Sequence, residues 1–205
     1  MIVAVLDTGC DINHESVKNN IVDCYNAIDK RSGDVKDYNG HGTHIASIIT
    51  RMAPECELMI IKVLSYTGRG DPRHITEGVG YALKNGANII NTSFASPSDE
   101  GHLLIKLCES YGISIVASAP YYGETLLYPA CFPEVISVGT LGADFNSDPR
   151  FIDIYAPGID IVGAAANTNG YRRMTGTSQS AAYVSGMLAK LENDREALYK
   201  KLTQK

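Results

Sequence analysis

The fold is decided by three successive runs of sequence: ANIIN at 87–91, LLIKLCESY at 103–111 and ISIVA at 113–117. The first and third runs are short and rich in isoleucine and valine, which is typical of buried strands. The second run has the length and the apolar spacing of a helix. A strand, a helix and a strand in succession predict a right-handed βαβ unit of a parallel sheet.

The same alternation continues on both sides of this segment. Further strands are predicted at 2–6, 59–64, 135–139, 152–156 and 161–163, and further helices at 41–51, at 74–85, after Ser178 and up to Lys205. Residues 26–40 are a predicted loop, and we interpret its Asp/Lys-rich part, Asp29–Asp37, as solvated. We therefore predict one α/β domain over residues 1–205, with a mostly parallel central sheet and helices on both faces.

The composition is that of an ordinary globular protein. Of the 205 residues, 44% are hydrophobic and 20% are charged, which argues against a disordered, collagen-like or coiled-coil chain. The formal net charge of −5 argues against a partner that is nucleic acid or an anionic membrane. The sequence leaves the oligomeric state open.

No stretch of the sequence has the features of a signal peptide or of a membrane span. The apolar run that follows Met1 ends at Asp7 and has no basic residues before it. The 5 cysteines are widely spread and lack CxxC spacing, which favours reduced thiols over a disulfide framework or a zinc site. We therefore expect a cytoplasmic protein without a metal or other cofactor.

Three polar segments follow predicted strands or precede predicted helices, where the functional groups of parallel sheets gather. Asp7 ends the first strand, His41 lies in NGHGTH directly before a helix, and Ser178 lies in MTGTSQSAA before another helix. A carboxylate, an imidazole and a hydroxyl act together when Ser attacks a carbonyl, His takes its proton and Asp orients the His. The three segments therefore predict nucleophilic catalysis.

Taken one at a time, the same residues have other interpretations. Asp7-Thr8-Gly9 is also an aspartic-protease motif, but the chain holds no second copy, so that activity would require a dimer. His41 and His44 form an HxxH pair that lacks a third metal ligand. Ser178 and Ser180 are both suitable helix N-caps.

The sequence resembles the subtilisin-like serine proteases in three motifs and in their order. These motifs are VAVLDTG at 3–9, NGHGTHIASI at 39–48 and MTGTSQSAAYVSG at 174–186. Further similarity lies in VLSYTGRG at 63–70, NIINTSF at 88–94, YPACFPEVISVGT at 128–140 and IYAPGIDI at 154–161. The resemblance implies a three-layer subtilisin-like fold and a serine endopeptidase that acts on peptides or proteins through an acyl-enzyme.

The resemblance also implies the role of each site residue. Asp7 would be the orienting acid, His41 the general base and Ser178 the nucleophile. The implied substrate-binding residues are Gly68, Arg69 and Gly70 as an edge strand, Ser93, Phe94 and Ala95 as the opposite wall, and Ser118, Ala119, Pro120 and Leu127. Binding by strand addition suits extended peptides, because it uses main-chain hydrogen bonds. Leu127 at the back of the first specificity pocket would favour small or medium P1 side chains.

The sequence departs from the family in the segment that supplies the oxyanion donor. Most members have AAGN there, whereas this chain has Ala119, Pro120 and Tyr121. Loss of the Asn donor lowers the rate of subtilisin about 100- to 1,000-fold. The backbone N–H of Ser178 would then act with a substitute donor, for which we consider the hydroxyl of Tyr121 or Tyr122.

These departures favour a slow and selective protease with a role in limited processing, such as removal of a leader peptide. The chain between Thr50 and Met59 lacks the longer loop that often binds calcium, so we expect no calcium dependence. We also expect a protease that does not depend on a pro-domain. The alternative function is a catalytically weak or inactive pseudoprotease that binds peptides.

Overall fold

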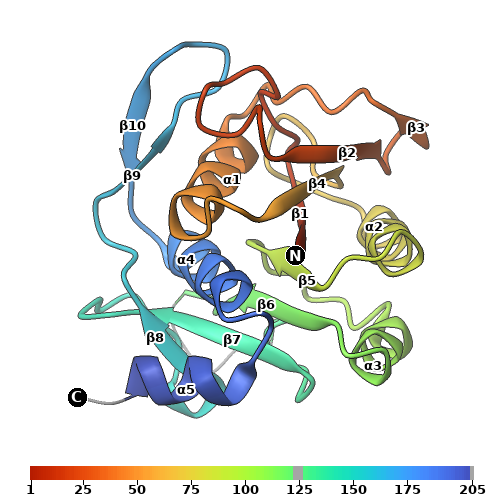
Figure 1. The fold of residues 1–205 in the computed structure, drawn as a ribbon. Helices are drawn as coiled ribbons and strands as arrows, with labels where there is room; N and C mark the ends of the chain where they lie inside the picture. Colours follow the sequence, from red (N-terminus) through yellow and green to blue (C-terminus); the bar gives the residue numbers. More distant parts are fainter. Residues whose placement is uncertain (122–126, 204–205) are drawn as a thin grey trace.

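The computed structural model describes residues 1–121 and 127–203, and in them the predicted sheet is the centre of the fold (Figure 1). The sheet has 8 strands in the order β3-β2-β4-β1-β5-β6-β7-β8. Its strands are β1 (Ile2–Asp7), β2 (Ile21–Asn26), β3 (Arg31–Ser32), β4 (Glu57–Lys62), β5 (Ile89–Thr92), β6 (Ser114–Ser118), β7 (Val135–Thr140) and β8 (Ile154–Ala156). All neighbours pair in parallel except β2 and β3.

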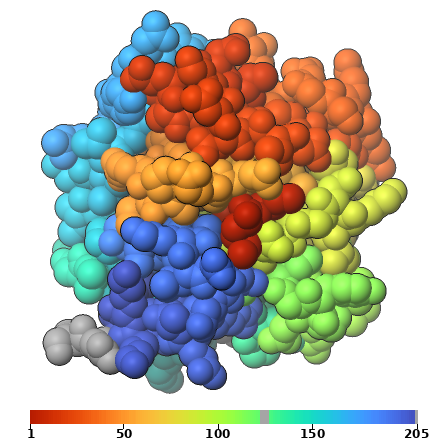
Figure 2. All heavy atoms as spheres, in the orientation of Figure 1, coloured from red at the N-terminus to blue at the C-terminus, as the bar shows by residue number. Residues whose placement is uncertain are grey.

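Helices cover both faces of this sheet. The helices α1 (His41–Met52), α4 (Thr177–Lys190) and α5 (Arg195–Thr203) lie on one face, and α2 (Pro72–Lys84) and α3 (His102–Ser110) lie on the other (Figure 1). The segments of α1 and α4 lie in contact at the surface of the first face (Figure 2). A short 3-10 helix, η1 (Pro149–Phe151), precedes β8. These three layers confirm the predicted fold class.

The alternation of side chains along β1 explains the three layers. Val3 and Val5 are buried in the hydrophobic cluster that contains α1 and α4. Ala4 and Leu6 are buried in the other cluster, which contains α2 and α3. Successive side chains of a strand point to opposite faces, so a central strand that is apolar on both faces requires cover on both.

The structure differs from the sequence-based predictions in several places. The predicted strand at 161–163 is not part of the central sheet, because β9 (Ile161–Ala164) pairs with β10 (Tyr171–Met174) as a separate antiparallel hairpin that packs on α1. The sequence pattern does not predict β2, whose burial is partial, the two-residue β3 inside the predicted loop, or β10. Asp37 lies in the predicted solvated loop but is fully buried. In the described part of the chain, no helix is both long enough and apolar enough to cross a membrane.

The topology brings the ends of four neighbouring strands to one edge of the sheet. β4, β1, β5 and β6 are adjacent and parallel, so their carboxyl ends share that edge. Asp7 ends β1, Ser93 follows β5, and Pro120 lies just beyond β6. In open parallel sheets, binding and catalytic groups lie at this edge.

Candidate active site

Asp7 and His41 are in direct contact at the carboxyl end of β1. His41 Nδ1 lies 2.8 Å from Asp7 Oδ1 and 2.9 Å from Asp7 Oδ2. The backbone N–H of Thr8 donates to Asp7 Oδ1 at 2.7 Å. The Asp7 side chain is 1% exposed and that of His41 is 20% exposed, so the imidazole reaches the surface while the carboxylate does not. The carboxylate therefore holds the Nδ1–H tautomer, which leaves Nε2 as the acceptor.

The start of α1 places His41 against the turn that follows β1. His41 is the first residue of the helix, and Gly42 is the second. A Cβ on Gly42 would lie 3.1 Å from Asp7 Cβ and would collide with the carbonyl oxygen of Gly9. Only glycine at position 42 allows the helix to begin this close to Asp7.

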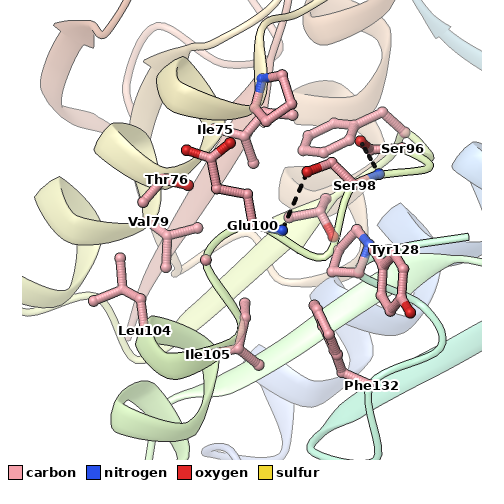
Figure 3. A pocket seen from close by; sticks show the side chains of 15 residues that line it. Ile75, Thr76, Val79, Ser96, Ser98, Glu100, Leu104, Ile105, Tyr128 and Phe132 are labelled. Carbon is pink, nitrogen blue, oxygen red and sulfur yellow. Dashed lines mark hydrogen bonds between the residues drawn. The ribbon is translucent and has the colours of Figure 1, made fainter.

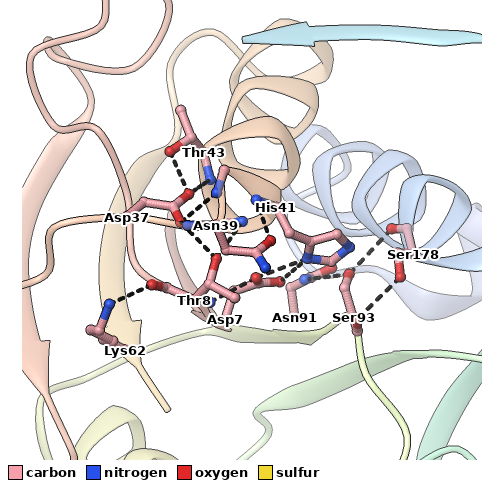
Figure 4. A network of polar contacts seen from close by, with 12 residues as sticks. Asp7, Thr8, Asp37, Asn39, His41, Thr43, Lys62, Asn91, Ser93 and Ser178 are labelled. Carbon is pink, nitrogen blue, oxygen red and sulfur yellow. Dashed lines mark hydrogen bonds and ion pairs between the residues drawn. The ribbon is translucent and has the colours of Figure 1, made fainter. Parts of the chain in front are cut away.

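A second buried carboxylate, that of Asp37, joins the same turn to the same helix (Figure 4). Its Oδ1 accepts from Thr8 Oγ1 at 2.9 Å, from Asn39 N at 3.0 Å and from Gly40 N at 2.7 Å. Its Oδ2 accepts from Thr43 N at 3.0 Å and from Thr43 Oγ1 at 2.7 Å. Of these donors only the Thr43 N–H belongs to α1, because Asn39 and Gly40 precede the helix. Asp37 therefore links the start of α1 to the turn before it and to Thr8. The sequence signal was an Asp just ahead of NGHGTH, but it lies in a run of charged residues that we interpreted as solvated.

Lys62, at the end of β4, adds a further link to this turn. Its ammonium donates to the carbonyl of Thr8 at 2.8 Å (Figure 4). It also donates to the carbonyl of Lys36 at 2.7 Å. The turn after β1 is thus bonded to the buried Asp37 carboxylate through Thr8 Oγ1 and to the Lys62 ammonium through the Thr8 carbonyl.

The surroundings of His41 raise its pKa above the ordinary value. Burial lowers the pKa, but the negative charge of Asp7, the hydrogen bond to Asp7 and the charge of Asp37 together outweigh burial. A raised pKa makes the imidazole a stronger proton acceptor, as general-base catalysis requires.

Ser178 lies beside this pair, in the first turn of α4. Its Oγ donates to the carbonyl of Ser93 at 3.0 Å, and the Oγ of Ser93 donates to the carbonyl of Ser178 at 3.2 Å. Asn91 Nδ2 holds Ser93 Oγ at 3.0 Å. Figure 4 draws the His41 ring between Asp7 and the Ser93–Ser178 pair. Among the described residues, the Ser178 hydroxyl is bonded to Ser93 and not to His41.

The segment after β6 lies against the start of α4. Thr177 Oγ1 donates to the carbonyl of Ala119 at 2.7 Å, and the ring of Tyr121 packs edge-on against Phe145 with centroids 5.1 Å apart. Ser118, Ala119 and Pro120 are buried, so their role in substrate binding stays a prediction. Tyr122 falls outside the described residues.

The remaining predicted substrate-binding residues border the same edge of the sheet. Gly68, Arg69 and Gly70 are exposed in the loop between β4 and α2 and belong to no strand, so their role as an edge strand stays a prediction. Ser93 is buried, Phe94 is half-buried and Ala95 is exposed. Leu127 is half-buried, and its N–H donates to Cys131 Sγ at 3.2 Å.

A largely apolar pocket, which the sequence did not predict, lies between α2 and α3 (Figure 3). Apolar side chains of both helices and of the 128–132 turn line it, among them Ile75, Val79, Leu104, Ile105 and Phe132. Phe94 from the predicted substrate wall is part of the same lining, so the pocket adjoins the predicted groove.

Among the described side chains, the HxxH pair of His41 and His44 has no further partners arranged as metal ligands. Burial lowers the pKa of His44 to about 4, and its Nε2 lies 3.2 Å from the carbonyl of Ile161. Within residues 1–121 and 127–203, no group of three or more His, Cys, Asp or Glu side chains is arranged to hold a metal ion. Independence from metals stays a prediction.

Comparison with known proteins identifies the family. A model of the subtilase family, peptidase S8, matches residues 1–204. The chain is 37% identical over 229 residues to the major intracellular serine protease of Bacillus subtilis (strain 168), which covers 98% of this chain and 72% of the relative. It is 36% identical to an intracellular serine protease of Paenibacillus polymyxa, with 97% and 68% covered.

The structure is also similar to the crystal structure of a cold adapted subtilisin-like serine proteinase. The TM-score is 0.86 at 27% identity, and the match covers 94% of this chain and 76% of the other. The site described above lies within the part of the chain that the family model matches. The chain therefore belongs to the subtilase family and is a subtilisin-like serine protease.

Proposed function

We propose that Asp7, His41 and Ser178 are the catalytic triad of a serine endopeptidase. The observation that carries the proposal is the contact of His41 Nδ1 with both carboxylate oxygens of Asp7, beside a serine in the first turn of α4. This arrangement provides an oriented base, a nucleophile and the first-turn N–H groups of a helix within one site.

The reaction proceeds in two stages. Ser178 Oγ turns from Ser93 toward His41 and attacks the carbonyl carbon of the scissile bond, while its proton passes to His41 Nε2. The carbonyl oxygen becomes an oxyanion, the C–N bond breaks, and His41 returns the proton to the leaving amine. Water then attacks the acyl-enzyme with His41 again as base, which releases the acid product and restores Ser178. Asp7 stabilises the imidazolium throughout.

The substrate that fits this site is an extended peptide. The exposed loop at 68–70 and the segment at 94–95 border the carboxyl ends of the strands, and the pocket that contains Phe94 would take an apolar side chain of the substrate. Leu127 would favour small or medium P1 residues. The relatives from B. subtilis and P. polymyxa are named intracellular proteases, which supports a cytoplasmic location for this chain.

We further propose that catalysis is slow and selective, and suited to limited processing such as removal of a leader peptide. Two observations support this: the Ser178 hydroxyl rests on Ser93, and the segment at the oxyanion position has Tyr121 in place of Asn. The same two observations favour the second candidate, a pseudoprotease that binds peptides without turnover.

Labelling with a fluorophosphonate probe separates the two candidates. The protease should be labelled at one residue, and Ser178→Ala should abolish both labelling and peptide hydrolysis. Ser110→Ala, a change of an exposed serine at the end of α3, is the matched control and should leave both unchanged. A wild-type protein that binds peptides but takes up no label would support the pseudoprotease instead.

A further inference from the structure

Hydrolysis through Ser178 requires donors for the oxyanion, and the chain has no Asn at the usual position. Ser178 N–H lies in the first turn of α4, where a helix supplies no acceptor of its own, so it is one donor. The second donor must reach the same point from the segment after β6 or from α4 itself.

Gln179, the residue after Ser178, is a polar side chain that the triad does not use. It is 2% exposed, and its Nε2 has no hydrogen-bond partner among the described residues. A buried N–H without an acceptor is unfavourable, and such groups persist in folded proteins where a function requires them.

The Gln179 amide and the hydroxyl of Tyr121 both lie against Gly176. A Cβ placed on Gly176 would collide with Tyr121 Oη and would lie 3.0 Å from Gln179 Oε1, so both side chains converge on one point before Ser178. Glycine at 176 leaves the room for both. The edge-on contact with Phe145 and the bridge between Tyr121 and Asn146 hold the ring in that position.

We propose that Gln179 is a positioning residue that orients the Tyr121 hydroxyl as the second oxyanion donor. A half-turn of the terminal amide directs Nε2–H to Tyr121 Oη, which accepts this bond and donates its own hydrogen to the oxyanion. Tyr121 is 49% exposed and can contact the substrate, whereas Gln179 is buried. Hydrogen bonds in such a chain strengthen one another.

The inference rests on the proposed hydrolysis through Ser178, and kinetics of single and double variants test it. The probes are an N-acyl tetrapeptide p-nitroanilide with Ala at P1 and the matching peptide aldehyde, whose adduct with Ser178 carries an oxygen at the oxyanion position. Tyr121→Phe and Gln179→Met should each lower kcat about 10- to 100-fold with KM nearly unchanged. Affinity for the aldehyde should fall by the same factor, and affinity for the product peptide should not change.

The double variant distinguishes a positioning role from a merely structural one. Because Gln179 acts through Tyr121, the variant with both changes should be no slower than Tyr121→Phe alone. In a Tyr121→Asn background, where an amide donates directly, Gln179→Met should have no effect on kcat. Thermal melting of each variant verifies that it is folded, and Gln179→Glu, of nearly the same shape, serves if Gln179→Met does not fold.

Three results would overturn the inference: full kcat in folded Gln179→Met, multiplied losses in the double variant, or equal losses for aldehyde and product peptide. These results differ from failure of the proposed function, in which the wild-type protein takes up no fluorophosphonate and Ser178→Ala changes nothing.

Discussion

The two halves of the site differ in how completely their polar groups are paired. On the β1–α1 side, Asp7 holds His41 and Asp37 accepts five hydrogen bonds. On the β5–α4 side, Ser178 is bonded to Ser93, and Gln179 keeps an unpaired buried N–H. In the proposed mechanism, the acid–base half would therefore be assembled before substrate arrives, whereas the nucleophile half would have to rearrange. This rearrangement would be a physical reason for the slow turnover that we propose.

The largest expected effect on kcat comes from a substitution in the Asp7–His41 pair. Asp7→Asn keeps the size of the side chain but removes the charge that orients and stabilises His41, so kcat should fall about 10⁴-fold. Steady-state hydrolysis of the p-nitroanilide measures this. The exposed carboxylate of Glu109 on α3 provides the control, because Glu109→Gln should leave kcat unchanged. A loss below tenfold in Asp7→Asn would contradict the assigned role.

The pH dependence of kcat/KM tests the Asp7–His41 pair in the unmutated enzyme. Only neutral His41 accepts the proton, so kcat/KM should rise with pH, about tenfold per pH unit below the pKa of His41. Because Asp7 and Asp37 raise that pKa, the midpoint should lie above the ordinary value of about 6.5. In Asp7→Asn, burial without the opposing charge should move the midpoint to lower pH. A midpoint that stays in place would show that another group titrates.

A smaller effect is expected from Asp37, which supports the assembled half without touching the substrate. Asp37→Asn replaces one acceptor oxygen with an N–H₂ group, which faces the donors from Thr43 or from the 39–40 turn. The free energy of unfolding should fall by about 3 kcal/mol, and kcat by about tenfold. Urea denaturation and turnover measure the two losses. An unchanged free energy of unfolding would mean that the hydrogen bonds to Asp37 make no net contribution to stability.

The smallest effect is expected in the half that has to rearrange. Ser93→Ala removes the hydroxyl that donates to the Ser178 carbonyl, but it leaves the Ser93 carbonyl that accepts from Ser178 Oγ. We expect a change in kcat of no more than about threefold and a loss of about 1 kcal/mol in stability, since Asn91 Nδ2 loses its partner. A loss comparable to that of Asp7→Asn would place Ser93 in the catalytic machinery.

The sequence predicted the parts of the molecule that depend on local pattern. The strands at 2–6, 87–91 and 113–117 and the helices that begin near His41 and Ser178 lie within one or a few residues of the observed elements. The partly buried β2 and the exposed β10 lack the apolar pattern that identifies a strand. They form because neighbouring strands supply the hydrogen bonds.

The surroundings of Asp37 and Gln179 could not be predicted from the sequence. Asp37 lies among charged residues, and only the fold reveals that five donors from two segments surround it. Gln179 lies in the motif MTGTSQSAAYVSG, which predicts Ser178 as the nucleophile by its resemblance to the family. Its buried amide acquires meaning only beside Tyr121, which is 58 residues away along the chain.

By itself, the sequence determined the layered α/β architecture, the three motifs and the order in which Asp7, His41 and Ser178 occur. These properties follow from periodicity and residue type, which are local. The tertiary structure alone decided which hydroxyl, carboxylate and amide are paired, because hydrogen bonds depend on ångström distances between segments distant in the chain. One example is the hydrogen bond of Ser178 to Ser93, which forms beside an Asp7–His41 pair that is already in contact.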